Sequence, residues 1–179
     1  VENGASCLSI LTEEKFFLGK LEFIEDVKKK FEIPILAKDF FVDPYQVALS
    51  KSYGCDCILI IIAAMDEGQA DEIYSEALRH NLSVIVEVHD QKEAEMALKY
   101  DKALIGINNR NLKTLRTDIN TTFDIHDVLI SHSGPLISES GIKTKNELLE
   151  LSNKTTIKTF LIGESLLKDL DNNSIFSVL

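Results

Sequence analysis

Residues 83–90 read Ser-Val-Ile-Val-Glu-Val-His-Asp, and this stretch decides how the rest of the sequence is interpreted. Its nearly continuous β-branched run, interrupted only by Glu87, is typical of a parallel strand that is covered on both faces. Asp90 follows at once and, with Glu93 three residues later, has the spacing of a helix N-cap. The stretch therefore predicts a strand with a polar residue near its carboxyl end, followed directly by a helix.

The same pattern occurs six more times along the chain. Short β-branched runs alternate with longer helical patterns, and the runs start roughly 25 residues apart, which suffices for one strand, one helix and two loops. Besides Ser83–Val88, the predicted strands are Ser6–Leu11, Ile33–Lys38, Cys57–Ile62, Ala103–Ile107, Leu136–Glu139 and Phe160–Gly163. Helix starts are predicted where capping residues stand, at Asp43-Pro44, Asp66, Asp90 and Thr144, and helical spacing also links Leu21, Ile24, Val27 and Phe31.

Seven βα units fit either an open doubly wound sheet or a (β/α)8 barrel that lacks one unit. A nucleotide-binding doubly wound sheet needs a glycine-rich turn after its first strand, and residues 11–15 read Leu-Thr-Glu-Glu-Lys instead. A complete barrel takes roughly 250 residues, and the 179 residues here end soon after the last predicted helix. We therefore predict an α/β fold, a (β/α)8 TIM barrel truncated at the N-terminus with strands two to eight present, as one domain over residues 1–179.

Composition and charge exclude several classes of function. The 19 Lys and Arg against 29 Asp and Glu give 19 − 29 = −10, which disfavours nucleic acid as a partner. The longest apolar run, Cys57–Met65, is far shorter than the roughly 20 residues that span a bilayer, so no membrane partner is expected. Three cysteines without a framework spacing indicate reduced thiols, and with no visible secretory leader they favour a cytoplasmic location.

Polar residues follow the apolar runs of five predicted strands at their carboxyl ends. These residues include Lys38, Glu87, Asn108 with Arg110, Glu139 with Ser140 and Gly141, and Gly163 with Glu164. The carboxyl ends of the strands form the rim at which barrel enzymes place their active sites. One ammonium and two carboxylates suit proton transfer about a carbonyl or imine, and glycines after the last two strands are typical of phosphate-binding loops.

Each of these residues also has a structural alternative. Lys38 could pair with an acidic neighbour such as Asp39 or Asp43, and Glu87 could be a structural partner of Lys38. The two glycines could form tight turns alone. We interpret His89 as a structural contact next to Asp90, and His80, His126 and His132 as solvated. No two His or Cys residues have metal-ligand spacing, so no metal is predicted.

Six segments resemble indole-3-glycerol phosphate synthase of tryptophan biosynthesis, in family order and at family spacing between about residues 2 and 168. They are Ser-Ile-Leu-Thr-Glu-Glu-Lys-Phe-Phe (9–17), Leu-Ala-Lys-Asp-Phe-Phe-Val-Asp-Pro-Tyr-Gln (36–46), Val-Glu-Val-His-Asp (86–90), Gly-Ile-Asn-Asn-Arg-Asn-Leu-Lys-Thr (106–114), Ser-Glu-Ser-Gly-Ile (138–142) and Leu-Ile-Gly-Glu-Ser-Leu (161–166). The resemblance implies a carboxy-lyase that closes the pyrrole ring of 1-(2-carboxyphenylamino)-1-deoxyribulose 5-phosphate. Its products are indole-3-glycerol phosphate, CO2 and water, and neither a cofactor nor a metal is implied.

The resemblance also assigns roles to individual residues. Lys38 matches a catalytic general acid and Glu87 a carboxylate used in acid–base steps, while Asn108 and Glu139 match residues that hold substrate hydroxyls. Arg110 matches an arginine near the site. The matches to the phosphate loops are Ser140, Gly141, Gly163 and Glu164, and the matches to apolar positions around the aromatic ring are Phe40 and Leu59.

The chain departs from the family pattern at its front. A first strand with a Glu-x-Lys pair, a Ser-Pro-Ser phosphate loop and an N-terminal helix have no counterpart, so the fragment by itself is expected to be inactive. We expect a monomer or weak homodimer with a phosphorylated small-molecule substrate. The alternatives are a non-catalytic barrel remnant and another phosphate-binding barrel enzyme. Among the latter, a sugar-phosphate isomerase would place Cys or Asp where Glu87 stands, and a Schiff-base aldolase would place Lys where Asn108 stands.

Overall fold

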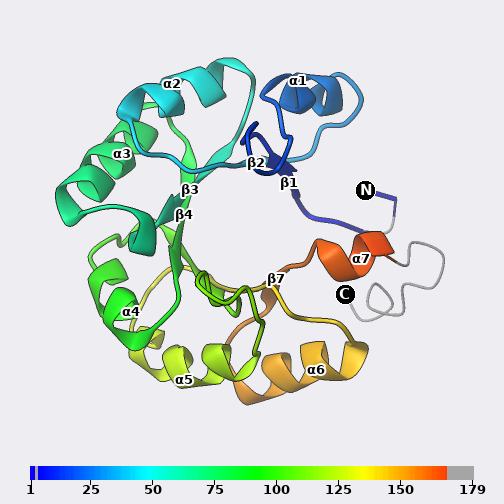
Figure 1. The fold of residues 1–179 in the computed structure, drawn as a ribbon, viewed down its shortest axis with the longest axis vertical. Helices are drawn as coiled ribbons and strands as arrows, with labels where there is room; N and C mark the ends of the chain where they lie inside the picture. The colour runs from blue at the N-terminus through cyan, green and yellow to red at the C-terminus, as the bar shows by residue number, and fades with distance from the viewer. Residues whose placement is uncertain (3, 169–179) are drawn as a thin grey trace. The chain divides into compact units, whose positions relative to one another are not determined.

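The computed structural model describes residues 1–2 and 4–168, and the part of the predicted domain beyond residue 168 lies outside them. The chain divides into two compact units, Val1–Val86 and Glu87–Leu179. Strand β4 (Ser83–Val88) runs from the first unit into the second. Between residues 4 and 168 the strands are each followed by a helix, which confirms the predicted α/β class (Figure 1).

The first unit contains three strands in parallel order β1-β2-β3 before it reaches β4. Its buried side chains, among them Ile24, Ile35, Ile58 and Ile73, come from both strands and helices. Helices α2 and α3 lie side by side along the strands (Figure 1). The elements are β1 (Leu8–Leu11), α1 (Glu22–Lys28), β2 (Ile35–Lys38), α2 (Pro44–Ser52), β3 (Cys57–Ile61), the 3-10 helix η1 (Ile62–Ala64) and α3 (Glu67–Arg79).

The second unit repeats the arrangement with parallel order β5-β6-β7. Helices α4, α5 and α6 lie next to one another in chain order (Figure 1). One part of its core packs Ile142, Leu148 and Leu151 against partly buried aromatic and aliphatic side chains. The elements are α4 (Gln91–Ala97), β5 (Leu104–Asn108), α5 (Asn120–Leu129), β6 (Leu136–Glu139), α6 (Lys145–Lys154), β7 (Thr159–Leu161) and α7 (Glu164–Lys168).

The predicted N-caps are confirmed. Asp43 and Thr144 form full capping boxes with Gln46 and Glu147, and the side chains of Asp66 and Asp90 each accept a hydrogen bond from a backbone N–H in the first turn. These contacts satisfy N–H groups that have no partner inside a helix, so they fix where each helix starts.

Strand bounds agree with prediction to within two residues, and β4 and β6 agree at both ends. Strand β2 starts at Ile35 because Pro34 has no N–H to donate, although its carbonyl oxygen accepts from the Leu8 N–H at 2.9 Å. Helix α1 ends at Lys28, so the prediction that Phe31 continues its apolar face is wrong, and that ring is exposed. No described helix is long and apolar enough to cross a bilayer.

Candidate active site

Three polar side chains meet at the carboxyl ends of strands in the second unit. Glu87 is the fifth residue of β4, Asn108 ends β5, and Glu139 ends β6 directly opposite Asn108 in the strand register. Glu87 and Glu139 are each only 1% exposed, and Asn108 is also buried. Burying a carboxylate is costly unless hydrogen bonds or opposite charges compensate it, so these positions need local partners.

The Asn108 amide provides one such partner and is itself held at both ends. Its Nδ2 donates to Glu87 Oε1 at 3.0 Å, and its Oδ1 accepts from the Arg110 backbone N–H at 3.0 Å. The second contact requires an oxygen and therefore fixes which way the amide is turned. Asn108 thus presents a donor to Glu87 from a fixed position.

Glu87 also faces a cation from its own strand end. His89 Nε2 lies 3.2 Å from Glu87 Oε1, so one carboxylate oxygen contacts both the Asn108 amide and the imidazole ring. Burial disfavours the ionised form of a carboxyl group, whereas a hydrogen-bond donor and a neighbouring positive charge favour it. A buried carboxylate that is oriented in this way is suited to acid–base chemistry.

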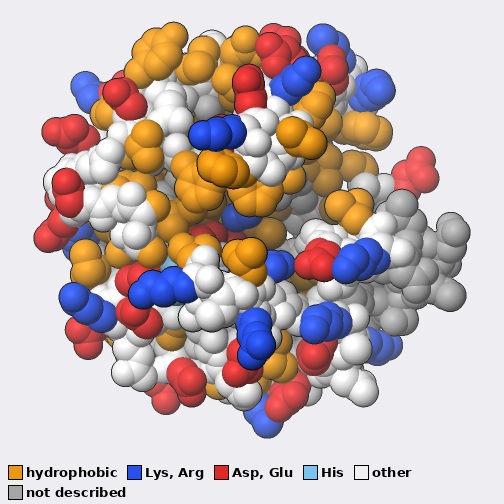
Figure 2. All heavy atoms as spheres, viewed as in Figure 1, with side chains coloured by type: hydrophobic (Ala, Val, Ile, Leu, Met, Phe, Trp, Pro, Cys, Tyr) orange, Lys and Arg blue, Asp and Glu red, His pale blue; other side chains and the backbone are white. Residues whose placement is uncertain are grey.

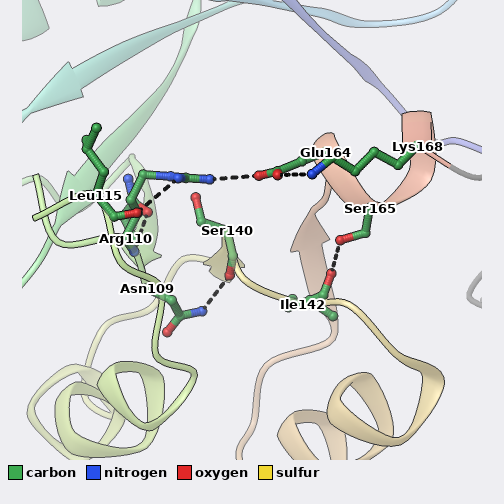
Figure 3. A network of polar contacts seen from close by, with 9 residues as sticks. Asn109, Arg110, Leu115, Ser140, Ile142, Glu164, Ser165 and Lys168 are labelled. Atoms are coloured by element: carbon green, nitrogen blue, oxygen red, sulfur yellow. Dashed lines mark hydrogen bonds and ion pairs between the residues drawn. The ribbon is translucent and has the colours of Figure 1, made fainter.

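Arg110 extends from the β5–α5 loop to the first residue of α7. Its guanidinium donates to the Leu115 carbonyl and to Glu164 Oε2, both at 3.2 Å, and Glu164 Oε1 accepts from Lys168 at 2.6 Å (Figure 3). Hydrogen bonds from Lys168 and Arg110 lower the pKa of the Glu164 carboxyl below its ordinary value. The two loops are therefore connected through charged side chains.

The turn after β6 has left-handed backbone at both Ser140 (φ 64°) and Gly141 (φ 77°). Ser165 Oγ donates to the Ile142 carbonyl at 2.6 Å, which ties this turn to α7. In Figure 3 the Ser140 side chain points toward the Arg110–Glu164 contact. Gly163, just before α7, has open space where a side chain would stand. The four residues assigned to phosphate loops thus lie on two turns that the structure connects.

Asn109 is an organising residue that the predicted set of site residues left out. Its Nδ2 donates to Ser138 Oγ and to the Ser140 carbonyl, both at 3.1 Å, and its Oδ1 accepts from the backbone N–H and the hydroxyl of Thr122. A 2% exposed amide with both ends bonded joins β5, α5 and the turn after β6. Its position beside Asn108 was the available signal, but its partners lie 13 to 31 residues away.

The remaining predicted residues lie in the first unit. Lys38 ends β2, opposite Leu11 at the end of β1, and is half-buried. Leu59 is fully buried in β3, whereas Phe40 is 41% exposed just after β2. Figure 2 shows hydrophobic side chains gathered at the surface over this unit, and the exposed ones include Phe16, Phe17, Phe40, Val42 and Tyr45.

Phe17 is a second residue that sequence reasoning missed. Its ring lies 6.3 Å from the Phe40 ring, at an angle of 35°, and is 53% exposed. The Glu13 carboxylate accepts hydrogen bonds from the backbone N–H groups of Lys15, Phe16 and Phe17, so it shapes the turn that carries the ring. The Gly19 N–H closes this loop by donating to the Glu13 carbonyl at 2.8 Å, and a Cβ at Gly19 would collide with the Leu11 carbonyl. The two rings thus form a small exposed aromatic surface just after β2.

The cysteines and histidines form no metal centre among the described residues. Burial raises the pKa of Cys55 to about 11 and of Cys57 to about 12, so both thiols stay protonated at neutral pH. The prediction that His126 is solvated is wrong, because its ring is buried and its Nε2 lies 3.0 Å from Thr156 Oγ1.

The family model described as indole-3-glycerol phosphate synthase matches residues 1–178 of the chain. The chain belongs to the indole-3-glycerol phosphate synthase family. It is 42% identical over 168 residues to the synthase of Azospirillum brasilense, and 42% identical over 177 residues to that of Acinetobacter baumannii. These alignments cover 94% and 98% of the chain, but only 63% and 65% of the two relatives.

The synthase of Burkholderia lata gives the same result, with 40% identity over 93% of this chain and 63% of the relative. A solved structure of an Aquifex aeolicus VF5 protein superposes with a TM-score of 0.70 over 99% of this chain and 79% of its own, at 15% identity. That likeness concerns the fold alone. With the repeated parallel βα units between residues 4 and 168, it confirms the predicted fold class, a truncated (β/α)8 barrel, for the part of the chain that the structure describes.

Proposed function

We propose that this member of the indole-3-glycerol phosphate synthase family takes part in the reaction for which its relatives are named. In that reaction a carbon of the carboxyphenylamino ring attacks the ketone of the deoxyribulose phosphate, and CO2 and water are then lost. The observation that carries the proposal is the buried contact between Glu87 and Asn108, beside Glu139, in a chain that the family model matches from residue 1 to 178.

The second unit contributes the acid–base groups. Glu87 acts as the carboxylate that removes a proton during ring closure and loss of water, because it is buried and held in an orientation suited to a base. Asn108 and Glu139 hold the substrate hydroxyls, and their opposite places in the β5–β6 register support a shared task.

Lys38 serves as the general acid in this proposal. Attack on a ketone produces an alkoxide, and a positioned ammonium is suited to protonate it. Phe40 and Leu59 pack around the aromatic ring of the substrate. We add Phe17 to this set, since its exposed ring lies next to that of Phe40.

Phosphate binding is assigned to Ser140, Gly141, Gly163 and Glu164, with the backbone N–H contributed by Glu164 and a supporting role for Arg110. The open space at Gly163 and the side-chain contacts between the two turns support this assignment. A phosphate held far from the reacting carbons supplies binding energy that orients them.

The wider properties follow from the same proposal. The substrate is a phosphorylated small molecule, and the reaction needs neither a metal nor a cofactor. Residues 1–179 act within a single barrel domain of a cytoplasmic enzyme that is a monomer or a weak homodimer. The strong negative charge of −10 is in keeping with a protein that does not bind nucleic acid.

The proposal is tested by the fluorescence of the indole product formed from the carboxyphenylamino-deoxyribulose phosphate. The assay uses the protein expressed from its complete gene, and product should form. No product from the full gene product would overturn the proposal and leave the non-catalytic remnant as the better description.

Lys38→Ala should reduce turnover of the active protein by at least about a hundredfold, because the developing alkoxide loses its proton donor. Lys51→Ala is the matched control, since Lys51 is an exposed lysine in the last turn of α2 and has no assigned role. Circular dichroism of both variants checks that the fold is intact. Undiminished turnover of Lys38→Ala would remove Lys38 from its role.

A further inference from the structure

His89 lies between two carboxylates, one on each side of its ring. Its Nε2 is 3.2 Å from Glu87 Oε1, and its Nδ1 is 3.0 Å from Glu93 Oε2. Its side chain is 12% exposed, and those of Glu87 and Glu93 are 2% and 17% exposed. The three side chains therefore form a largely buried row from the end of β4 to the first turn of α4.

Glu93 is held in place by the start of α4. Its backbone N–H donates to the capping Asp90 carboxylate at 2.9 Å, and its Oε2 also accepts from the His89 backbone N–H at 2.8 Å. The same oxygen thus contacts the backbone and the ring of His89. The helix cap consequently fixes where the imidazole stands.

Both ring nitrogens of His89 face carboxylate oxygens, and carboxylates accept hydrogen bonds but do not donate them when ionised. This environment favours a ring that carries a proton on each nitrogen, which is the imidazolium form. The charged groups in contact with the ring are Glu87 on β4 and Glu93 in the first turn of α4, and the carboxylate of Asp90 accepts from the Glu93 backbone N–H at the start of that helix. The Asn108 amide of β5 meets the same Glu87 oxygen.

The charge balance agrees with this geometry. Burial by itself lowers the pKa of His89, but the hydrogen bond to Glu93 and the close carboxylates of Glu87 and Glu93 outweigh burial and raise the pKa to about 9. The imidazolium is therefore the form present at neutral pH. It offsets part of the cost of burying the Glu87 carboxylate.

We propose that His89 is a positioning residue for Glu87, and that its imidazolium, held by Glu93, keeps Glu87 ionised and directed as a base. The inference rests on the proposed function for the step that Glu87 performs. It gives Glu87 one defined role, because a fixed cation beside a carboxyl group favours the ionised form, and only that form can accept a proton from the substrate. His89 itself need not touch the substrate.

His89→Gln removes the charge of the ring but keeps a hydrogen-bond donor at this position, so it tests the effect of the charge. We expect kcat at pH 7 to fall about tenfold and KM to change less than about twofold. The acidic limb of the kcat profile should move about one pH unit upward, since Glu87 then ionises less readily. Glu93→Gln should shift the profile in the same direction by a smaller amount.

His80→Gln is the matched control. His80 also contacts a glutamate four residues away along the chain, with Nε2 2.9 Å from Glu76 Oε1, but this pair lies at the C-terminal end of α3 and has no assigned role. Its pH profile should coincide with that of the unsubstituted protein. If His89→Gln also left the profile unmoved, or lost activity equally at every pH, the positioning role would be wrong.

A second measurement does not depend on turnover. In the 179-residue chain, the NMR titration of the His89 ring should have its midpoint near 9 and should move toward 6.5 in Glu93→Gln. A midpoint near 6.5 in the unsubstituted chain would show that the His89 ring is not held as an imidazolium between Glu87 and Glu93, and would overturn the proposal. Absence of product from the full gene product would instead contradict the proposed function, while the titration still decides whether His89 is held as an imidazolium.

Discussion

Two glycines near the ends of β6 and β7 are needed for different reasons. Gly141 has φ 77°, and a Cβ there would stand 2.8 Å from the Cβ of Thr117, so both backbone and packing require glycine. Gly163 has no atom within 4 Å of the place where its Cβ would be. The first glycine serves the fold, whereas the second leaves space next to the proposed phosphate position.

This contrast predicts opposite outcomes for two substitutions. Gly141→Ala should lower the free energy of unfolding by about 1–3 kcal/mol, because alanine is strained at positive φ. Gly163→Asp should change it by less than about 0.5 kcal/mol, but should raise KM about tenfold or more, since its carboxylate repels a phosphate. Urea unfolding and steady-state kinetics measure the two effects. An unchanged KM for Gly163→Asp would count against the phosphate assignment.

At the scale of elements, side-chain caps decide where helices begin. The Thr144 hydroxyl and the Glu147 carboxylate satisfy each other's backbone N–H groups at the start of α6. Helix α6 then places Leu148 and Leu151 in the core of the second unit. The cap therefore links a local sequence motif to the packing beneath the turn after β6.

Thr144→Ala should lower the free energy of unfolding by about 1 kcal/mol, because the Glu147 N–H loses its acceptor. Thr144→Ser keeps the hydroxyl, so its loss of unfolding free energy should be only a few tenths of the loss in Thr144→Ala. Urea denaturation at one pH compares the two variants. Equal losses for alanine and serine would show that the methyl group, and not the capping contact, carries the effect.

At the scale of the whole molecule, His89 couples stability to pH. Its pKa is about 9 in the folded chain and about 6.5 when unfolded, so the folded state binds the proton more tightly. The stabilisation is complete below pH 6.5 and is lost as the pH rises from 6.5 through about 9. Its upper limit is about 3 kcal/mol.

The difference in unfolding free energy between the unsubstituted chain and His89→Gln should therefore be largest near pH 6 and smallest near pH 9.5. Apart from Glu87 and Glu93, which contact the ring, the other titratable groups are shared by the two chains and largely cancel in the difference. Urea unfolding at pH 6, 8 and 9.5 measures it, with His80→Gln as the reference substitution. A difference that stays constant over this range would contradict the linkage.

Much of the fold was predictable because its signals are local. The β-branched runs of β4 and β6 and the capping residues Asp43 and Thr144 act within a few residues of themselves. Errors arose where a local pattern was overridden, as at Phe31, which keeps the helical spacing although α1 has already ended. His126 was misjudged because its partner Thr156 lies 30 residues away.

By itself, the sequence determined which residue types stand at the strand ends, and the family to which the chain belongs. Only the tertiary structure decided that Asn108 and His89 meet the same oxygen of Glu87, that Asn109 joins two turns, and that the rings of Phe17 and Phe40 lie together. Hydrogen bonds and ion pairs depend on distances of a few ångströms and on direction. Strand order and packing, which bring distant segments into register, set those distances.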